Sequence, residues 1–117
     1  MTIKDKIAII TGSGSGIGKQ IALDLARDGC NIVVASLISK QVEQTVQEAK
    51  QFGIKAIGIA KDLSDPSNVS DLVNKTIDEF GKIDILINCA AIIIPEWFTE
   101  ETIETFDRTI AINLRSM

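Results

Sequence analysis

The chain has 117 residues, of which 45% are hydrophobic and 24% are charged, a balance typical of one globular domain. Its net charge of −4 gives no support to a nucleic-acid-binding surface. There is no histidine, and Cys30 and Cys89 match no metal spacing, so we expect reduced thiols and no metal site. The N-terminus lacks a signal-peptide pattern, and the longest near-apolar stretch, residues 85–94, is too short to span a bilayer. We therefore expect a cytoplasmic protein that binds neither membranes nor nucleic acids.

Short apolar runs alternate with helical periods along the chain. The expected strands are residues 7–11, 32–35, 56–60 and 83–87. A helix is expected after each of the first three strands, and these helices are closed by Gly29, Gly53 and Gly81. Their apolar faces are Ile17, Ile21, Ala22, Leu25 and Ala26 in the first, Val42, Val46, Ala49 and Phe52 in the second, and Val69, Leu72, Val73, Ile77 and Phe80 in the third.

The third helix has the clearest start, because Asp65 suits an N-cap and Pro66 suits the first helical position. After the fourth strand we expect a loop through Pro95. A last helix capped by Thr99 follows, with one apolar side formed by Ile103, Phe106, Ile110 and Leu114. This alternation predicts an α/β fold, a Rossmann-like three-layer α/β/α arrangement around a parallel sheet. We expect strand order 3-2-1-4 in one incomplete domain spanning residues 1–117.

A glycine-rich segment, residues 11–18, joins the first strand to the first helix. This position brings backbone N–H groups and the positive end of a helix to the carboxyl edge of the sheet, where they suit a pyrophosphate. Glycine allows the backbone to approach such a ligand closely. The alternative is a flexible strand–helix turn without a ligand.

The register of the glycines separates the known nucleotide-binding patterns. A P-loop requires glycine at Ser13 and Ser or Thr at Gln20, and the Gly-x-Gly-x-x-Gly pattern requires glycine at Ile17. A methyltransferase-like pattern requires an acidic residue at Ile10. The spacing that fits is Thr-Gly-x-x-x-Gly-Ile-Gly, and in this segment the chain resembles the short-chain dehydrogenase/reductase family.

Three further motifs extend this resemblance over the whole chain, which corresponds to about the first half of a family member. Asp62-Leu63 follows the third strand, and residues 88–91, Asn-Cys-Ala-Ala, stand where the family has Asn-Asn-Ala-Gly. Asn113-Leu114 matches the family's Asn-Leu motif. The resemblance implies that Asn113 supports the proton relay and that the dinucleotide is bound by the other motif residues. These are Gly12, Ser13, Ser15, Gly16, Ile17, Gly18, Ser36, Leu37, Lys40, Asp62, Leu63, Asn88, Ala90 and Ala91.

The end of the second strand bears on the choice between NAD and NADP. NAD-preferring family members carry Asp at the position of Ser36, and many NADP-preferring members carry Arg at the position of Leu37. This chain has neither. Ser36, Ser39 and Lys40 are able to bond a 2′-phosphate, which favours NADP, although Lys40 is equally well explained as a solvated residue at a helix start.

The family transfers a hydride between the nicotinamide and a carbonyl or alcohol carbon, using a Ser, a Tyr and a Lys that lie beyond the position of Asn113. This chain contains no Tyr, so we expect it to be inactive alone and to act on a substrate only with the C-terminal half supplied. A non-catalytic nucleotide-binding module and a degenerate fragment are the alternatives. An exposed fourth strand and last helix also predict self-association.

Overall fold

The computed structural model describes residues 2–89, and their regular elements occur in strict strand–helix alternation. The elements are β1 (Ile7–Thr11), α1 (Gly16–Arg27), β2 (Asn31–Ser36), α2 (Ser39–Lys50), β3 (Ala56–Ala60), α3 (Pro66–Phe80) and β4 (Ile85–Asn88). The strands form one parallel sheet in the order β3-β2-β1-β4, as the sequence predicts. The expected last helix lies outside the described residues.

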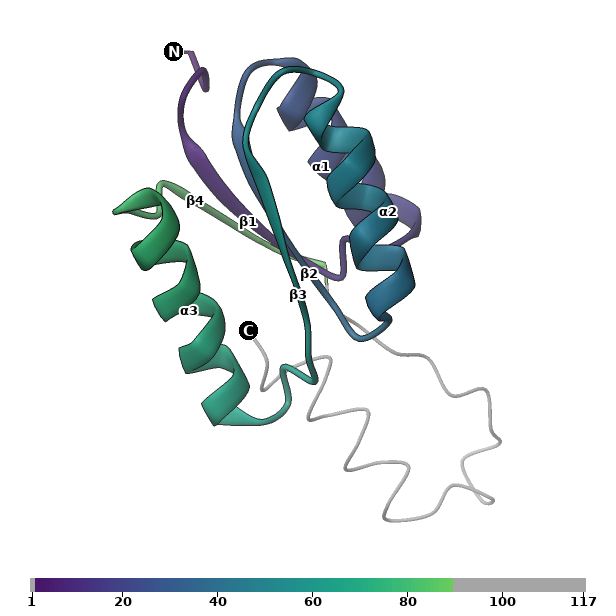
Figure 1. The fold of residues 1–117 in the computed structure, drawn as a ribbon, viewed down its shortest axis with the longest axis vertical. Coiled ribbons are helices and arrows are strands. Elements are labelled where there is room, and N and C mark those ends of the chain that lie inside the picture. Colours follow the sequence, from purple (N-terminus) through teal and green to yellow (C-terminus); the bar gives the residue numbers. More distant parts are fainter. Residues whose placement is uncertain (1, 90–117) are drawn as a thin grey trace.

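Helices cover both faces of this sheet, and α1 and α2 lie on one face while α3 lies on the other (Figure 1). Alternate strand residues therefore enter two separate cores. Ile10, Ile32 and Val34 pack toward α1 and α2, whereas Ile9 and Val33 pack toward α3. Because both faces are covered, all five residues of β1 are buried, which explains why the central strands are continuous apolar runs.

The helix ends follow the predicted capping residues closely. The Asp65 side chain accepts a hydrogen bond from the Ser67 amide at 2.9 Å, and Pro66 is the first residue of α3. Gly81 ends that helix in the left-handed region at φ 80°. The second helix ends at Lys50, earlier than expected, because residues 51–53 form a turn in which the Gly53 amide donates to the Lys50 carbonyl.

The predicted fourth strand is shifted along the chain, since β4 begins at Ile85 instead of residue 83. The pairing of β1 with β4 runs from Ala8 opposite Ile85 to Thr11 opposite Asn88. Before it begins, the Asp84 carboxylate accepts a hydrogen bond from the Ile7 amide at 2.9 Å, and the Asp84 amide donates to the Ile7 carbonyl. The Asp84 carboxylate thus accepts the hydrogen bond of the Ile7 amide in place of a backbone carbonyl of the neighbouring strand.

The expected buried faces of all three helices are wrong in part. In the second, Phe52 lies beyond the end of α2 and is 47% exposed. Ile17 is 78% exposed because it lies in the first turn of α1, beyond the end of the sheet it was expected to cover. Val73 and Ile77 of α3 are also exposed, although Leu72, directly before Val73, is buried. Val73 lines a cavity together with Leu86 of β4, which is 54% exposed.

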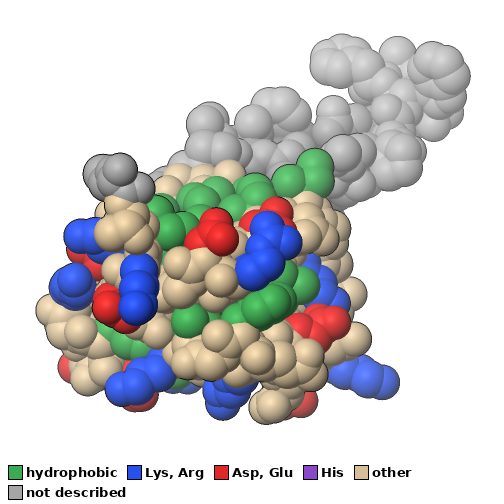
Figure 2. Space-filling model, turned by 90° about the horizontal axis from the view of Figure 1, so that it is seen from above, with side chains coloured by type: hydrophobic (Ala, Val, Ile, Leu, Met, Phe, Trp, Pro, Cys, Tyr) green, Lys and Arg blue, Asp and Glu red, His purple; other side chains and the backbone are tan. Residues whose placement is uncertain are grey.

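The surface of the described residues carries basic and acidic side chains intermingled, as Figure 2 shows for the face seen from above. Within residues 2–89, no helix is both long enough and apolar enough to cross a bilayer. No group of three or more His, Cys, Asp or Glu side chains in this range is arranged to hold a metal ion.

Candidate functional site

The carboxyl ends of the four parallel strands meet at one edge of the sheet, and the loops that follow β1, β2 and β3 begin there (Figure 1). Strand β1 lies between β2 and β4, so the chain goes to one side of β1 after α1 and β4 returns to its other side. This is the topological switch point, where open α/β sheets bind their ligands. The loop at this point is residues 12–15, inside the predicted glycine segment.

The glycines of this loop have specific backbone roles. Gly12 and Gly16 adopt positive φ values of 66° and 58°, which allow the chain to turn sharply from the strand into α1. Gly18 packs so closely on the Gly12 carbonyl that a Cβ at residue 18 would overlap it. The first turn of α1 is therefore held directly against the end of β1.

Ser13 fastens the loop to the sheet. Its side chain is fully buried, its hydroxyl donates to the Ile10 carbonyl at 2.6 Å, and the same oxygen accepts from the Ala35 amide at 3.2 Å. The Ser13 amide donates back to the Ala35 carbonyl at 3.3 Å. The Ser13 side chain thus bridges the ends of β1 and β2, so it supports the loop from beneath.

The start of α1 differs from the start of α3 in its capping. Ser15 is the N-cap residue of α1, but its side chain makes no capping hydrogen bond. Asp65, the N-cap residue of α3, does make a capping hydrogen bond, with the Ser67 amide. The first amides of a helix need a partner from outside its own ladder, and an anion is a suitable partner. The exposed residues Ser15, Gly16 and Ile17 surround these amides.

The predicted residues of the second strand lie beside the glycine loop. Ser36 ends β2, and its Oγ lies 2.9 Å from the position that a Cβ of Gly14 would occupy. Leu37 and Lys40 are exposed, in the following loop and in the first turn of α2. The structure therefore brings Ser36 against the loop and leaves the Leu37 and Lys40 side chains open to solvent.

The predicted residues after the third strand are connected to the same edge by backbone contacts. The Lys61 amide donates to the Ser36 carbonyl at 3.0 Å, and Asp62 follows. One Asp62 carboxylate oxygen accepts from the amide and the hydroxyl of Ser64, at 2.9 and 2.7 Å. This arrangement gives Asp62 a structural role in the turn before α3, in addition to the adenine contact expected of it.

Asn88, at the end of β4, lies opposite Thr11 of β1 in the sheet. The following Cys89 amide donates to the Thr11 hydroxyl at 3.1 Å, which keeps the chain beside β1 as it leaves the sheet. Asn88 and Leu63 line a largely apolar cavity of about 110 Å³ between α3 and the strands β1 and β4. Three predicted site residues, Ala90, Ala91 and Asn113, lie outside the described residues.

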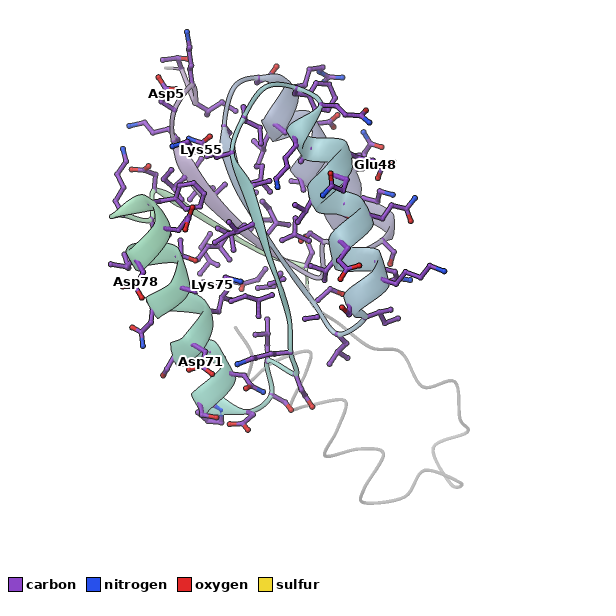
Figure 3. The ribbon with its side chains drawn as sticks, viewed as in Figure 1. Asp5, Glu48, Lys55, Asp71, Lys75 and Asp78 are labelled. Atoms are coloured by element: carbon purple, nitrogen blue, oxygen red, sulfur yellow. The ribbon has the colours of Figure 1, made fainter. Side chains whose placement is uncertain are left out.

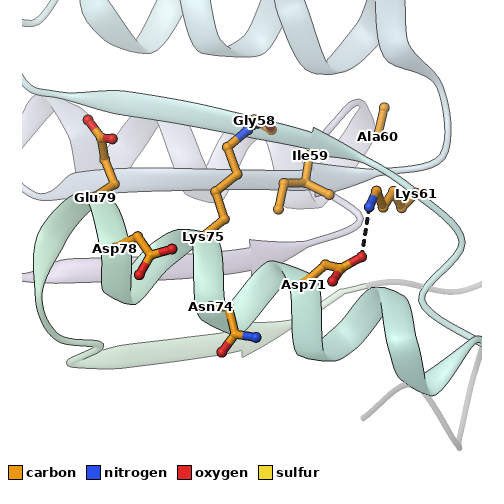
Figure 4. Close-up of a pocket in the computed structure, with 9 residues that line it drawn as sticks. All are labelled: Gly58, Ile59, Ala60, Lys61, Asp71, Asn74, Lys75, Asp78 and Glu79. Atoms are coloured by element: carbon orange, nitrogen blue, oxygen red, sulfur yellow. Dashed lines mark hydrogen bonds and ion pairs between the residues drawn. The ribbon is translucent and has the colours of Figure 1, made fainter.

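Another hollow lies beside the edge strand β3, away from the predicted residues. Lys61 and Asp71 form an ion pair of 2.8 Å across it, and the Lys75 ammonium donates to the Gly58 carbonyl at 3.0 Å (Figure 4). These three side chains are thus paired with each other or with the strand edge. We regard it as a protected strand edge and place the candidate site at the glycine loop.

Cys30 lies away from this site. Cys30 precedes β2 at the opposite edge of the sheet, where its thiol donates to the Lys6 carbonyl at 3.2 Å. Burial, followed by the negative charge of Asp84, raises the pKa of the Cys30 thiol. Both cysteines are free.

Comparison with known proteins agrees with this geometry. The model of the short chain dehydrogenase family matches residues 6–117, which include the glycine loop and all four strands. The chain belongs to the short-chain dehydrogenase family. A subunit of (2S)-[(R)-hydroxy(phenyl)methyl]succinyl-CoA dehydrogenase from Thauera aromatica is 36% identical over 98% of this chain and 46% of its own length. 2-Dehydro-3-deoxy-D-gluconate 5-dehydrogenase from Dickeya dadantii is 34% identical over 98% of this chain and 45% of its own.

Solved structures of short-chain dehydrogenases superimpose closely on the chain. L-Sorbose reductase from Gluconobacter frateurii, complexed with NADPH and L-sorbose, has a TM-score of 0.94 and 31% identity, over 99% of this chain and 44% of the reductase. A 7α-hydroxysteroid dehydrogenase complexed with NADH and 7-oxo glycochenodeoxycholic acid has a TM-score of 0.91 and 34% identity, over 98% and 45%. The chain therefore has the Rossmann-like fold of the family, and it spans a little under half of the length of these relatives.

Sequence reasoning missed the residues of α2 that touch the glycine loop. Gln41 lies against Gly14, and the Thr45 hydroxyl donates to the Gly14 carbonyl. The available signal is the spacing of polar residues at 41, 45 and 48, which places them on one side of the helix next to its apolar face. Only the packing of α2 against the loop shows that Gln41 and Thr45 contact Gly14.

Proposed function

We propose that residues 1–117 form the dinucleotide-binding part of an NAD(P)-dependent oxidoreductase that transfers a hydride between nicotinamide and a carbonyl or alcohol carbon. The observation that carries this proposal is the open first turn of α1 at the switch point of the sheet, in a member of the short-chain dehydrogenase family. The amides that follow Ser15 would bind the pyrophosphate, because several N–H donors converge there with the positive end of the helix dipole.

The remaining roles extend along the same edge. Ser36, Leu37 and Lys40 would surround the adenosine ribose, and Asp62 and Leu63 would border the adenine. Asn88, Ala90 and Ala91 would pass beside the nicotinamide half, with Asn113 in support of the proton relay. The bound cofactor supplies the hydride or accepts it, and the residues of this chain hold it in place.

Binding of the dinucleotide is tested by calorimetry with NADPH and NADH on the chain and on two variants of Ile17. Ile17→Pro removes one amide donor in the first turn of α1, a position that tolerates proline, whereas Ile17→Ala keeps the amide and shortens the exposed side chain. We expect Ile17→Pro to bind about tenfold or more weakly than Ile17→Ala, since a hydrogen bond to a charged phosphate is lost. Absence of binding by the unsubstituted chain, or equal binding by the two variants, would contradict the proposal.

We further propose a preference for NADP over NAD. No carboxylate stands at the end of β2 to repel a 2′-phosphate, and the Lys40 ammonium is exposed in the first turn of α2. Lys40→Ala should weaken NADPH binding and leave NADH binding unchanged, whereas Lys50→Ala at the other end of α2 should change neither. Tenfold tighter binding of NADH than of NADPH, about 1.4 kcal/mol, would reverse the assignment.

Turnover is proposed to need the catalytic Ser, Tyr and Lys of the family, which have no counterpart within these 117 residues. We therefore expect dinucleotide binding by the chain without oxidation or reduction of a carbonyl or alcohol substrate. A non-catalytic nucleotide-binding role is the second candidate, and a cytoplasmic location remains a prediction. Hydride transfer to a ketone by the chain alone would contradict this division of roles.

A further inference from the structure

One side of α2 is polar although it faces the rest of the protein. Gln41, Thr45 and Glu48 are spaced four and three residues apart, so they lie in one stripe along the helix. Thr45 is completely buried, and Gln41 and Glu48 are half-buried. Buried polar groups are costly unless they are paired, so the partners of this stripe identify its purpose.

Each residue of the stripe contacts the segment that runs from the glycine loop into α1. The Gln41 Cβ lies 3.1 Å from the position that a Cβ of Gly14 would occupy. The Thr45 hydroxyl donates to the Gly14 carbonyl at 3.5 Å. One turn further along, the Glu48 carboxylate forms an ion pair of 2.6 Å with Lys19, in the first part of α1.

These contacts hold the loop on the side that the sheet does not reach. Ser13 ties the loop to β1 and β2, whereas the stripe ties Gly14 and the start of α1 to α2. Glu48 lies on α2, on the opposite side of the sheet from Lys75 and Asp71 of α3 (Figure 3). The stripe is therefore directed at the glycine loop and takes no part in the polar groups of the α3 face.

We propose that Thr45 is a positioning residue for the dinucleotide, which orients the peptide unit of Gly14 and with it the amides at the start of α1. This inference rests on the proposed function, because the pyrophosphate is the ligand whose site the loop would form. A preorganised loop binds its ligand more tightly, because less conformational entropy is lost when the ligand binds. Thr45 itself lies behind the loop and does not touch the ligand.

The test compares Thr45→Val, which keeps the shape but lacks the hydroxyl, with Thr45→Ser, which keeps the hydroxyl. Thr76→Val is the matched control, since Thr76 is equally buried but its hydroxyl donates to the Leu72 carbonyl within α3. Calorimetry with NADPH well below the melting temperature measures affinity in the folded chain. Amide chemical shifts of Gly14, Ser15 and Gly16 report the loop without any ligand.

We expect Thr45→Val to bind NADPH about three- to tenfold more weakly than the unsubstituted chain, in keeping with the loss of one hydrogen bond. Thr45→Ser should bind NADPH as tightly as the unsubstituted chain. Thr76→Val should lower the melting temperature without changing the affinity for NADPH. The three loop amides should shift in Thr45→Val only. Unchanged affinity or unshifted amides in Thr45→Val would overturn the positioning role and leave the proposed function intact. Absence of NADPH binding by the unsubstituted chain would overturn both.

Discussion

Gly18 illustrates how one residue connects the local sequence with the shape of the candidate site. It is buried beneath the loop, and its missing side chain allows α1 to lie directly on the Gly12 carbonyl. The spacing of the glycines marked this position in the sequence. The reason for the glycine, a contact with backbone six residues earlier, appears only in the structure.

Gly18→Ala should therefore displace α1 from the end of β1. We expect a loss of about 1–3 kcal/mol in the free energy of unfolding, as for other overpacked positions, together with weaker NADPH binding. Urea denaturation and calorimetry measure the two effects. Gly53→Ala is the control, because its added methyl group meets no atom within 4 Å and only its positive φ is unfavourable. It should lose stability without losing affinity; equal affinities of the two variants would contradict the role of Gly18.

Asp84 is a second residue whose role the sequence concealed. The hydrogen bond from the Ile7 amide, assisted by the nearby Lys82 ammonium at 3.3 Å, holds the pKa of the Asp84 carboxyl below its ordinary value of 3.8. A carboxyl whose pKa is lower in the folded state stabilises the fold above its unfolded pKa. This contribution is lost as the pH falls through the folded pKa.

Asp84→Asn should therefore be less stable than the unsubstituted chain at pH 6, and the difference should shrink below about pH 4 as the wild-type carboxyl becomes protonated. Urea denaturation from pH 6 to pH 2 measures this difference. Asp78→Asn, on exposed α3, provides the control for the loss of one negative charge. A difference that stays constant across the range would show that the Asp84 carboxylate does not stabilise the start of β4.

At the scale of elements, the edge strand β3 shows how the chain protects an open ladder. Its outer backbone groups have no neighbouring strand in the described sheet, and exposed strand edges invite pairing with other chains. Lys75 of α3 reaches over this edge to the Gly58 carbonyl (Figure 4). The charged side chain thus satisfies one edge carbonyl and makes the approach of another strand unfavourable.

Lys75→Met should uncover this edge and increase self-association above that of the unsubstituted chain. Sedimentation velocity over a range of protein concentrations provides the measurement. Lys50→Met removes another exposed lysine, from the end of α2, and serves as the control. Identical sedimentation of the two variants would mean that Lys75 has no protective role.

The secondary structure was largely predictable, whereas the exact extent of some elements was not. Asp65, Pro66 and Gly81 predict both ends of α3 because capping depends on local chemistry. The start of β4 is set by pairing with β1, a contact across more than 70 residues of sequence. The same limit applies to the site: the glycine loop is a local pattern, but Thr45 joins it through packing between α1, α2 and the sheet.

At the scale of the whole molecule, the face beside α3 is less completely covered than the face beneath α1 and α2. Val73 and Leu86 expose apolar surface at the cavity that Leu63 and Asn88 also line, and Ile77 of α3 is exposed as well. Within residues 2–89, one helix serves this face of the sheet, whereas two helices serve the other. Self-association, predicted from the sequence, stays a prediction, and this face offers a place to test it.

Self-association through this face should depend on Leu86, the most exposed of the three side chains. We expect the chain to form concentration-dependent oligomers and Leu86→Gln to shift them toward the monomer. Light scattering at micromolar concentrations measures the change, and Phe52→Gln, at an exposed apolar position of the α2–β3 turn, is the control. A clean monomer of the unsubstituted chain would contradict the prediction.

The sequence by itself determined the alternation of strands and helices, the glycine loop and the family, because these depend on periodicity, capping and spacing within short segments. Strand order followed from the general rules for strand–helix–strand crossovers. Only the tertiary structure decided that Ser13 supports the loop from below, that Thr45 and Glu48 hold its other side, and that Asp84 starts the pairing of β4. Those roles arise between residues distant in the chain, and hydrogen bonds and close packing specify them through geometry that no local pattern encodes.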